Sequence, residues 1–144
     1  MTIAYYTTEH RAGVMYDYYS KQLLSEFPDY YFVFGDNTKR VGNGGQAIIR
    51  DMPNALGLVT KRLPSHTIDA YMTGTKEDYA AVDADLERIQ KLLDEGNTVI
   101  FPATGVGTGL AALNIHAPEL LIYIDNRISK MIGADYEIIH THLK

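Results

Sequence analysis

The segment Pro102–Leu113, with the sequence PATGVGTGLAAL, constrains the fold more than any other stretch of this chain. It follows Thr98–Phe101, an apolar run typical of a buried strand, and it precedes a stretch that favours a helix. A chain that leaves a strand through several glycines can approach a ligand closely and direct several N–H groups at one point. The order of strand, glycine-rich loop and helix therefore indicates an α/β domain with a phosphate-type loop.

A second glycine cluster, Gly42–Gly45 with the sequence GNGG, has the same context. It follows the strand-like run Tyr30–Gly35 and precedes the helix-like stretch Gln46–Asp51. A lone glycine loop is often only a tight turn, but two of them at strand ends favour a ligand site. The candidate ligand-binding residues are Gly42, Asn43, Gly44, Gly45 and Gln46 in this loop, and Thr104, Gly105, Val106, Gly107, Thr108, Gly109 and Leu110 in the other.

Composition limits the class of protein. The 144 residues, 46% of them hydrophobic, predict one compact domain spanning residues 1–144. The net charge is −5 and the 13 basic residues are scattered, so we expect no long nucleic acid as a partner. The absence of cysteine excludes disulfides, thiolate nucleophiles and cysteine-type zinc sites.

Neither a membrane partner nor a metal is expected. No apolar run approaches the roughly 20 residues of a membrane-spanning helix, and the first ten residues, MTIAYYTTEH, do not resemble a signal peptide. We therefore expect a soluble, cytoplasmic protein. The five histidines show no metal-ligand spacing, so no metal and no cofactor is predicted, and His66, His116 and His140 are interpreted as structural.

The remaining patterns predict alternating strands and helices. Strands are expected at Thr2–Thr7, Tyr30–Gly35, Ala55–Thr60, Asn97–Phe101 and Tyr136–His140. Helices are expected at Met15–Phe27, Gln46–Asp51, Lys76–Glu95 and Pro118–Ile132. This alternation predicts a three-layer α/β/α domain with a mixed, mostly parallel central sheet. Ligands of such sheets bind at the carboxyl ends of the strands, where both glycine clusters fall.

Polar residues follow two of these strands. Asp36 and Asn37, after Gly35, are interpreted in two ways: they accept hydrogen bonds from a ribose or a base, or they form an Asx-turn. Lys61 comes after the strand that ends at Thr60. Its side chain either is solvated or lies on the same rim as the glycine loops.

The order of the motifs resembles the macrodomain superfamily, and most of all its terminal ADP-ribose glycohydrolase branch. The resemblance spans about residues 30–127 and rests on GNGGQAIIR (Gly42–Arg50), LVTKR (Leu58–Arg62) and PATGVGTGLAAL (Pro102–Leu113). It implies a macrodomain fold that binds ADP-ribose. Enzymes of that branch remove ADP-ribose from protein carboxylates, so an ADP-ribosylated protein is the implied macromolecular partner.

The resemblance also implies roles for individual residues. Lys61 matches the lysine that attacks the anomeric carbon of ADP-ribose, whereas Ala111 stands where the hydrolases carry the aspartate that resolves the covalent intermediate. The glycine segments of the family match Gly42, Gly44, Gly45 and Ala47 in the first loop, and Gly105, Gly107, Gly109, Leu110 and Leu113 in the second, with one extra residue there.

We therefore expect this protein to bind ADP-ribose or a related NAD-derived nucleotide, with Thr60 and Gly35 on the same rim. Any ADP-ribosyl hydrolysis is expected to be slow or absent, with Lys61 as the nucleophile and Asp36 as the nearest candidate base. Two alternatives stay open. One is a non-catalytic module that sequesters or senses an NAD-derived signal. The other is a Rossmann-like nucleotide-monophosphate phosphoribohydrolase, because GVGTG also resembles the glycine segment of those enzymes.

Overall fold

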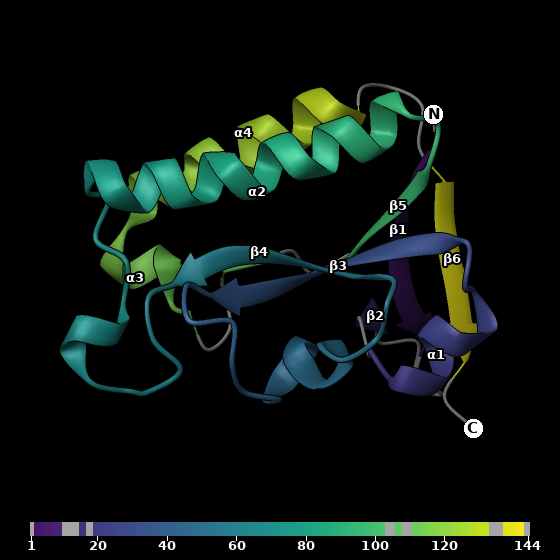
Figure 1. Ribbon diagram of the computed structural model, residues 1–144, viewed down its shortest axis with the longest axis horizontal. Helices are drawn as coiled ribbons and strands as arrows, with labels where there is room; N and C mark the ends of the chain where they lie inside the picture. Colours follow the sequence, from purple (N-terminus) through teal and green to yellow (C-terminus); the bar gives the residue numbers. More distant parts are fainter. Residues whose placement is uncertain are drawn as a thin grey trace.

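The protein is of the mixed α/β class (Figure 1). The computed structural model describes residues 2–9, 15–16, 19–102, 106–107, 111–132 and 137–142. The strands are β1 (Thr2–Glu9), β2 (Met15–Tyr16), β3 (Tyr30–Asn37), β4 (Ala55–Lys61), β5 (Thr98–Pro102) and β6 (Glu137–His142). The helices are α1 (Lys21–Glu26), α2 (Lys76–Asp94), α3 (Leu113–His116) and α4 (Pro118–Ile132), with two short 3₁₀-helices, η1 (Gly45–Ile49) and η2 (Ile68–Ala70).

One sheet organises these elements. Its strand order is β2-β1-β5-β3-β4, and β6 also pairs with β1. Every pairing is parallel except that of β1 with β2. The prediction of an α/β protein with a mixed, mostly parallel sheet is therefore confirmed for the described residues. Because β3 pairs in parallel with both β4 and β5, the carboxyl ends of these three strands lie at one edge of the sheet.

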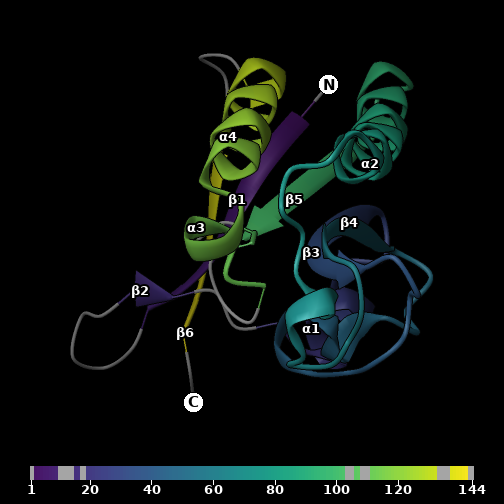
Figure 2. The ribbon, with the colours of Figure 1, turned by 90° about the vertical axis from the view of Figure 1, so that its left-hand side faces the viewer.

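Hydrophobic side chains pack against both faces of the sheet. Helices α2 and α4 lie side by side on one face, and α1 lies on the other (Figure 2). Strand β3 shows why both faces are covered: Val33 belongs to the cluster under α2 and α4, whereas Phe32 and Phe34 belong to the cluster with α1 and η1. Successive strand residues point to opposite faces, so an apolar run buries both.

The predicted helix Met15–Phe27 is wrong in its first half. Met15 and Tyr16 form the short strand β2, and the helix begins only after Ser20, whose hydroxyl accepts a hydrogen bond from the N–H of Leu23 at 3.1 Å. Serine is a strong N-cap because its oxygen satisfies a free N–H of the first turn. Tyr19, just before Ser20, is not part of a helix, and its hydroxyl donates to the carbonyl of Val33.

The helix predicted at Gln46–Asp51 is instead the 3₁₀-helix η1, which ends before Pro53. The two long helices match their predictions closely, since α2 ends one residue earlier than expected and α4 has the predicted bounds. Strands β3 and β4 run further than predicted, so Gly35, Asp36, Asn37, Thr60 and Lys61 all lie within strands. In the ranges that the structure describes, no helix combines the length and apolar character required to cross a membrane.

Candidate functional site

Two loops leave the sheet at the edge where β3 and β4 end: residues 38–44 after β3 and residues 62–75 after β4. Gly107, in the segment that follows β5, lies close to Thr60 of β4. A Cβ atom at Gly107 would lie 3.4 Å from Cγ2 of Thr60 and 2.6 Å from Cδ1 of Leu113. Its φ of +92° also favours glycine. Packing and backbone conformation together therefore explain why glycine occupies this position, without a role in ligand binding.

Lys61 is buried where these loops meet. Its exposed fraction is 7%, and no carboxylate in the described part of the chain forms an ion pair with it. The ammonium instead lies 4.9 Å from the centre of the Tyr71 ring. Burial lowers the pKa of Lys61 below its usual value, because desolvation disfavours the charged form. A buried lysine without a counter-ion is rare, which marks Lys61 as a functional candidate.

An aromatic stack covers the lysine. Tyr71 forms an isolated antiparallel bridge with Lys61, and its ring stacks on His116 of α3 with 4.1 Å between the ring centres. His116 therefore packs against the loop above Lys61. Within the described ranges, no group of three or more metal-ligating side chains comes together.

The loop that carries Tyr71 is fixed by a partly buried ion pair. Arg62 donates to both oxygens of Asp78, at 2.9 and 2.8 Å, and its backbone N–H donates to the carbonyl of Ala70. Burial raises the pKa of Asp78, but the hydrogen bonds from Arg62 and from the backbone outweigh it and lower this pKa to about 2. The backbone donors are Thr73, Thr75 and Gly74.

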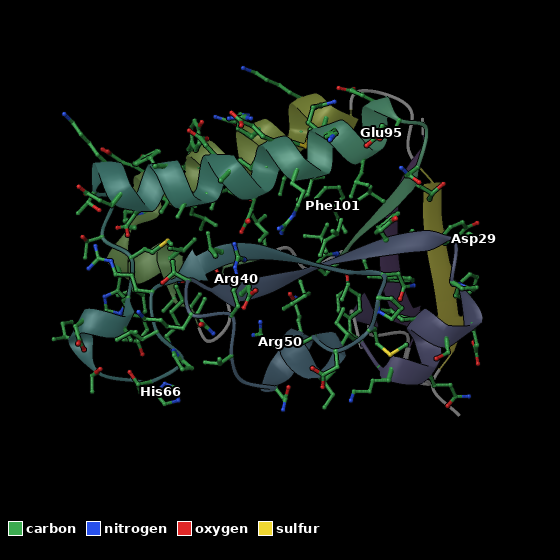
Figure 3. The ribbon with its side chains drawn as sticks, in the orientation of Figure 1. Asp29, Arg40, Arg50, His66, Glu95 and Phe101 are labelled. Carbon is green, nitrogen blue, oxygen red and sulfur yellow. The ribbon has the colours of Figure 1, made fainter. Side chains whose placement is uncertain are left out.

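Asp36 lies between two arginines. Its carboxylate, with 5% of the residue exposed, accepts from Nη1 of Arg40 at 3.2 Å and forms an ion pair with Nη1 of Arg50 at 2.7 Å. It also accepts the N–H of Asn37 at 2.8 Å. Figure 3 shows Arg40 on the side of β4 that faces α2 and Arg50 between the sheet and η1. Both oxygens of Asp36 are therefore engaged by groups of the protein itself.

The network continues to α2 through Arg40. Its guanidinium binds Asp85 in bidentate fashion, with N–O distances of 3.0 and 2.7 Å. Asp85 also accepts the N–H of Val59 at 2.8 Å, and Arg88 donates to the carbonyl of Gly57 at 3.0 Å. These two side chains of α2 satisfy backbone groups of the edge strand β4, which protects that edge from pairing with another chain.

Arg50 fixes the first glycine loop. Its Nε donates to the carbonyl of Gly42 at 2.8 Å, and its Nη2 donates to the carbonyl of Val41 at 3.1 Å. Residues Gly42–Gly45 are exposed. No acceptor for the N–H groups of Gly42 and Asn43 is found among the residues that the structure describes.

Asn37 and Gln46 make local contacts. The amide oxygen of Asn37 accepts the N–H of Lys39 at 3.0 Å, and its nitrogen donates to the carbonyl of Val41 at 2.7 Å. This geometry favours the Asx-turn interpretation for Asn37. Gln46 accepts the N–H of Gly35 at 2.9 Å, so the first loop is tied to β3.

The second glycine loop is described only in part. Thr104, Gly105, Thr108, Gly109 and Leu110 lie outside the described residues. Val106 is buried in the core beneath α2 and α4. Ala111 is also buried, and Ala112 adopts the left-handed conformation, with φ +48°, where α3 begins.

Sequence reasoning missed Arg40, Arg50, Tyr71 and Asp85. Asp85 carried a signal, because it falls between Val82 and Leu86 on the apolar stripe of α2, where a carboxylate needs a partner. Arg40, its partner, is 45 residues away in the chain and could not be found by local spacing.

Comparison with known proteins identifies the family alone. Residues 14–127 match a protein family described as "Family of unknown function (DUF7831)". Because the match covers more than half of the chain, the protein belongs to this family. Neither a curated protein nor a solved structure matches it.

Proposed function

We propose that this member of DUF7831 binds ADP-ribose or a related NAD-derived nucleotide at the edge where β3, β4 and β5 end. The observation that carries the proposal is the buried Lys61, which lacks a carboxylate partner in the described part of the chain. A desolvated cation at the same sheet edge as the exposed Gly42–Gly45 loop is suited to an anionic or polarised ligand. The resemblance to macrodomains supplies the identity of the nucleotide.

Each part of the site has a role in this proposal. The N–H groups of the Gly42–Gly45 loop, together with those of the loop after β5, donate to the diphosphate. Lys61 faces the distal ribose. Two observations support this arrangement: the first loop is exposed, and the N–H groups of Gly42 and Asn43 have no acceptor among the described residues.

The lowered pKa of Lys61 bears on catalysis. An ordinary lysine with a pKa near 10.4 is less than about 0.1% neutral at pH 7, and only the neutral amine attacks carbon. Burial increases the neutral fraction of Lys61. The neutral Nζ would form a bond to the anomeric carbon as the C–O bond to the linked protein carboxyl group breaks. The leaving group departs as a carboxylate anion, and the substituted Nζ carries a positive charge until it loses a proton to solvent.

The second chemical step has no base in this arrangement. Water must lose a proton as it attacks the lysine-linked ribose, and Ala111 has no group to take that proton. Asp36 is held by Arg40 and Arg50, so we assign it a structural role instead of catalysis. We therefore propose that the protein binds the nucleotide and hydrolyses it slowly or not at all. Such behaviour is expected of a module that sequesters or senses its nucleotide.

Calorimetric titration with ADP-ribose, AMP, ADP and NAD tests the proposal. We expect ADP-ribose to bind most tightly, since it alone presents a free distal ribose to Lys61 together with a diphosphate to the glycine loops. Lys61→Met should weaken ADP-ribose binding, whereas Lys91→Met, at an exposed site on α2, should not. Tightest binding of AMP would contradict the proposal and favour the phosphoribohydrolase alternative.

A further inference from the structure

We propose that Arg50, held in place by Asp36, is a positioning residue that sets the direction of the N–H groups in the first glycine loop. The inference rests on the proposed function, because it concerns the same nucleotide site. Three acceptors surround the Arg50 guanidinium: the carbonyls of Val41 and Gly42 and the carboxylate of Asp36. A guanidinium holds such a set because its donors have a fixed fork geometry.

The direction of the N–H groups follows from peptide geometry. The described chain has no cis peptide bond, and in a trans peptide the C=O and N–H groups point in opposite directions. The carbonyl of Val41 points toward Arg50, so the N–H of Gly42 points away from it. The carbonyl of Gly42 likewise turns the N–H of Asn43 outward. Arg50 thereby presents two successive donors on the side opposite its own positive charge.

The φ of Gly42 makes this arrangement attainable. Its value of +97° is one that side-chain-bearing residues rarely adopt, and it allows two successive carbonyls to meet one guanidinium. Asp36 anchors the other end of the fork at 2.7 Å and is itself fixed by the N–H of Asn37. The loop conformation is therefore tied to β3 before any ligand arrives.

Arg40 provides a matched control. It pairs with the same carboxylate of Asp36, at 3.2 Å, and its guanidinium otherwise binds Asp85. Among the residues that the structure describes, its side chain contacts no carbonyl of the glycine loop. Removal of Arg40 therefore takes away one positive charge and one ion pair to Asp36, as removal of Arg50 does, and also the ion pair to Asp85. It removes no contact with the carbonyls of Val41 and Gly42.

The experiment compares Arg50→Lys, Arg50→Met and Arg40→Met by calorimetric titration with ADP-ribose, with thermal melts of each variant. Lysine keeps the charge but cannot hold two carbonyls and a carboxylate in one plane. We expect both Arg50 variants to lose at least about tenfold in affinity, the loss of one to two charged hydrogen bonds. The affinity of Arg40→Met for ADP-ribose should stay within about threefold of the wild-type affinity, which is less than the loss expected for one charged hydrogen bond.

A second measurement reads the loop directly. In amide NMR spectra, ADP-ribose should shift the N–H signals of Gly42 and Asn43 in the wild type and in Arg40→Met, but not in Arg50→Lys. Affinity and shifts in Arg50→Lys equal to those of the wild type would overturn the inference and leave the proposed function intact. Equal losses in Arg40→Met and Arg50→Lys would also overturn it, because charge or stability alone would then explain them. Failure of the wild type to bind ADP-ribose would instead overturn the proposed function.

Discussion

The ammonium of Lys61 lies 4.9 Å from the centre of the Tyr71 ring, in a position where most buried lysines have a carboxylate. A cation–π contact contributes about 0.5–2 kcal/mol, which is less than the cost of removing an ammonium from water. The lowered pKa of Lys61 reflects this imbalance. The protein therefore retains Lys61 at some cost in stability, which is typical of a residue kept for its chemistry.

Lys61→Met should separate function from stability. Methionine fills a similar volume without a charge, so the free energy of unfolding at pH 7 should be unchanged or rise by up to about 1 kcal/mol. Binding of ADP-ribose should weaken. Urea denaturation and calorimetric titration measure the two effects, and a stability loss with normal binding would make Lys61 a structural residue.

The same substitution has a predicted pH dependence. A lysine whose pKa is lower in the folded state than in the unfolded chain destabilises the fold most at low pH. As the pH rises through the lowered pKa toward 10.5, the wild type should gain stability relative to Lys61→Met. Urea midpoints measured from pH 6 to pH 10 test the sign. If the stability of Lys61→Met relative to the wild type increased with pH, the prediction would be contradicted.

Ala111→Asp should increase turnover. A carboxylate at this position would supply the base that the second chemical step lacks, and general base catalysis contributes at least about a hundredfold when geometry is favourable. We expect release of ADP-ribose from a carboxylate-linked ADP-ribosylated protein to be very slow in the wild type and at least about tenfold faster in Ala111→Asp. Because Ala111 is buried, the variant should also be less stable.

Ala112→Asp is the control for that experiment, since aspartate tolerates the left-handed conformation of Ala112. It adds the same charge one residue further along and should leave the rate unchanged. Fast release by the wild type that Lys61→Ala abolishes would show that another residue acts as the base, and the binding-module interpretation would then fail.

Much of the fold was predictable because its signals are local. The apolar residues of α2 recur at helical spacing, and Thr75 and Asp78 form a capping box at its start. The short strand β2 was missed because two residues carry no periodic pattern and gain their structure only by pairing with β1. Helix α3 was missed because it has only four residues and no side-chain cap at its start, so it carries no local signal in the sequence.

The candidate site was predictable only in outline. Strand ends and glycine loops located the edge of the sheet and Lys61, because both depend on the order of residues along the chain. The interpretation of Asp36 needed its partners, Arg40 and Arg50, and those contacts depend on how the loop after β3 folds back. Lys61 could not be distinguished from a solvated lysine until Tyr71 was placed beside it.

Gly57→Ala should destabilise the protein, although alanine usually stabilises a strand relative to glycine by about 0.5–1 kcal/mol. A Cβ atom at Gly57 would overlap with Oδ2 of Asp36 and lie 3.1 Å from Nη1 of Arg40. The carboxylate must then move out of its ion pair. We expect a loss of about 1–3 kcal/mol, the range for overpacking and for a charged hydrogen bond.

Gly35→Ala is the matched control in the neighbouring strand. Its added Cβ would meet Gln46 and Thr60 at 3.6 Å, which is ordinary van der Waals contact. Its stability should be unchanged or slightly raised. Equal urea midpoints for the two variants would show that the space around Asp36 is not limiting.

The ion pair of Arg62 with Asp78 should make the stability of the fold depend on acid. The pKa of Asp78 is about 2 in the folded protein against 3.8 for the free group. A carboxyl group with a lowered pKa stabilises the fold fully above its unfolded pKa, and this contribution disappears as the pH falls through the folded pKa. The difference corresponds to about 2 kcal/mol, lost between about pH 4 and pH 2.

Asp78→Asn tests this contribution, since the amide keeps the shape of the side chain but not its charge. At pH 6 the variant should be less stable than the wild type by about 2 kcal/mol, and the gap should shrink as the pH falls toward 2. Glu77→Gln, an exposed neighbour in the first turn of α2, should show a small gap at every pH. Because Asp78 anchors the loop that holds Tyr71 over Lys61, Asp78→Asn should also weaken ADP-ribose binding at pH 7. A gap in stability that stays constant from pH 6 to pH 2 would show that the charge of Asp78 contributes nothing.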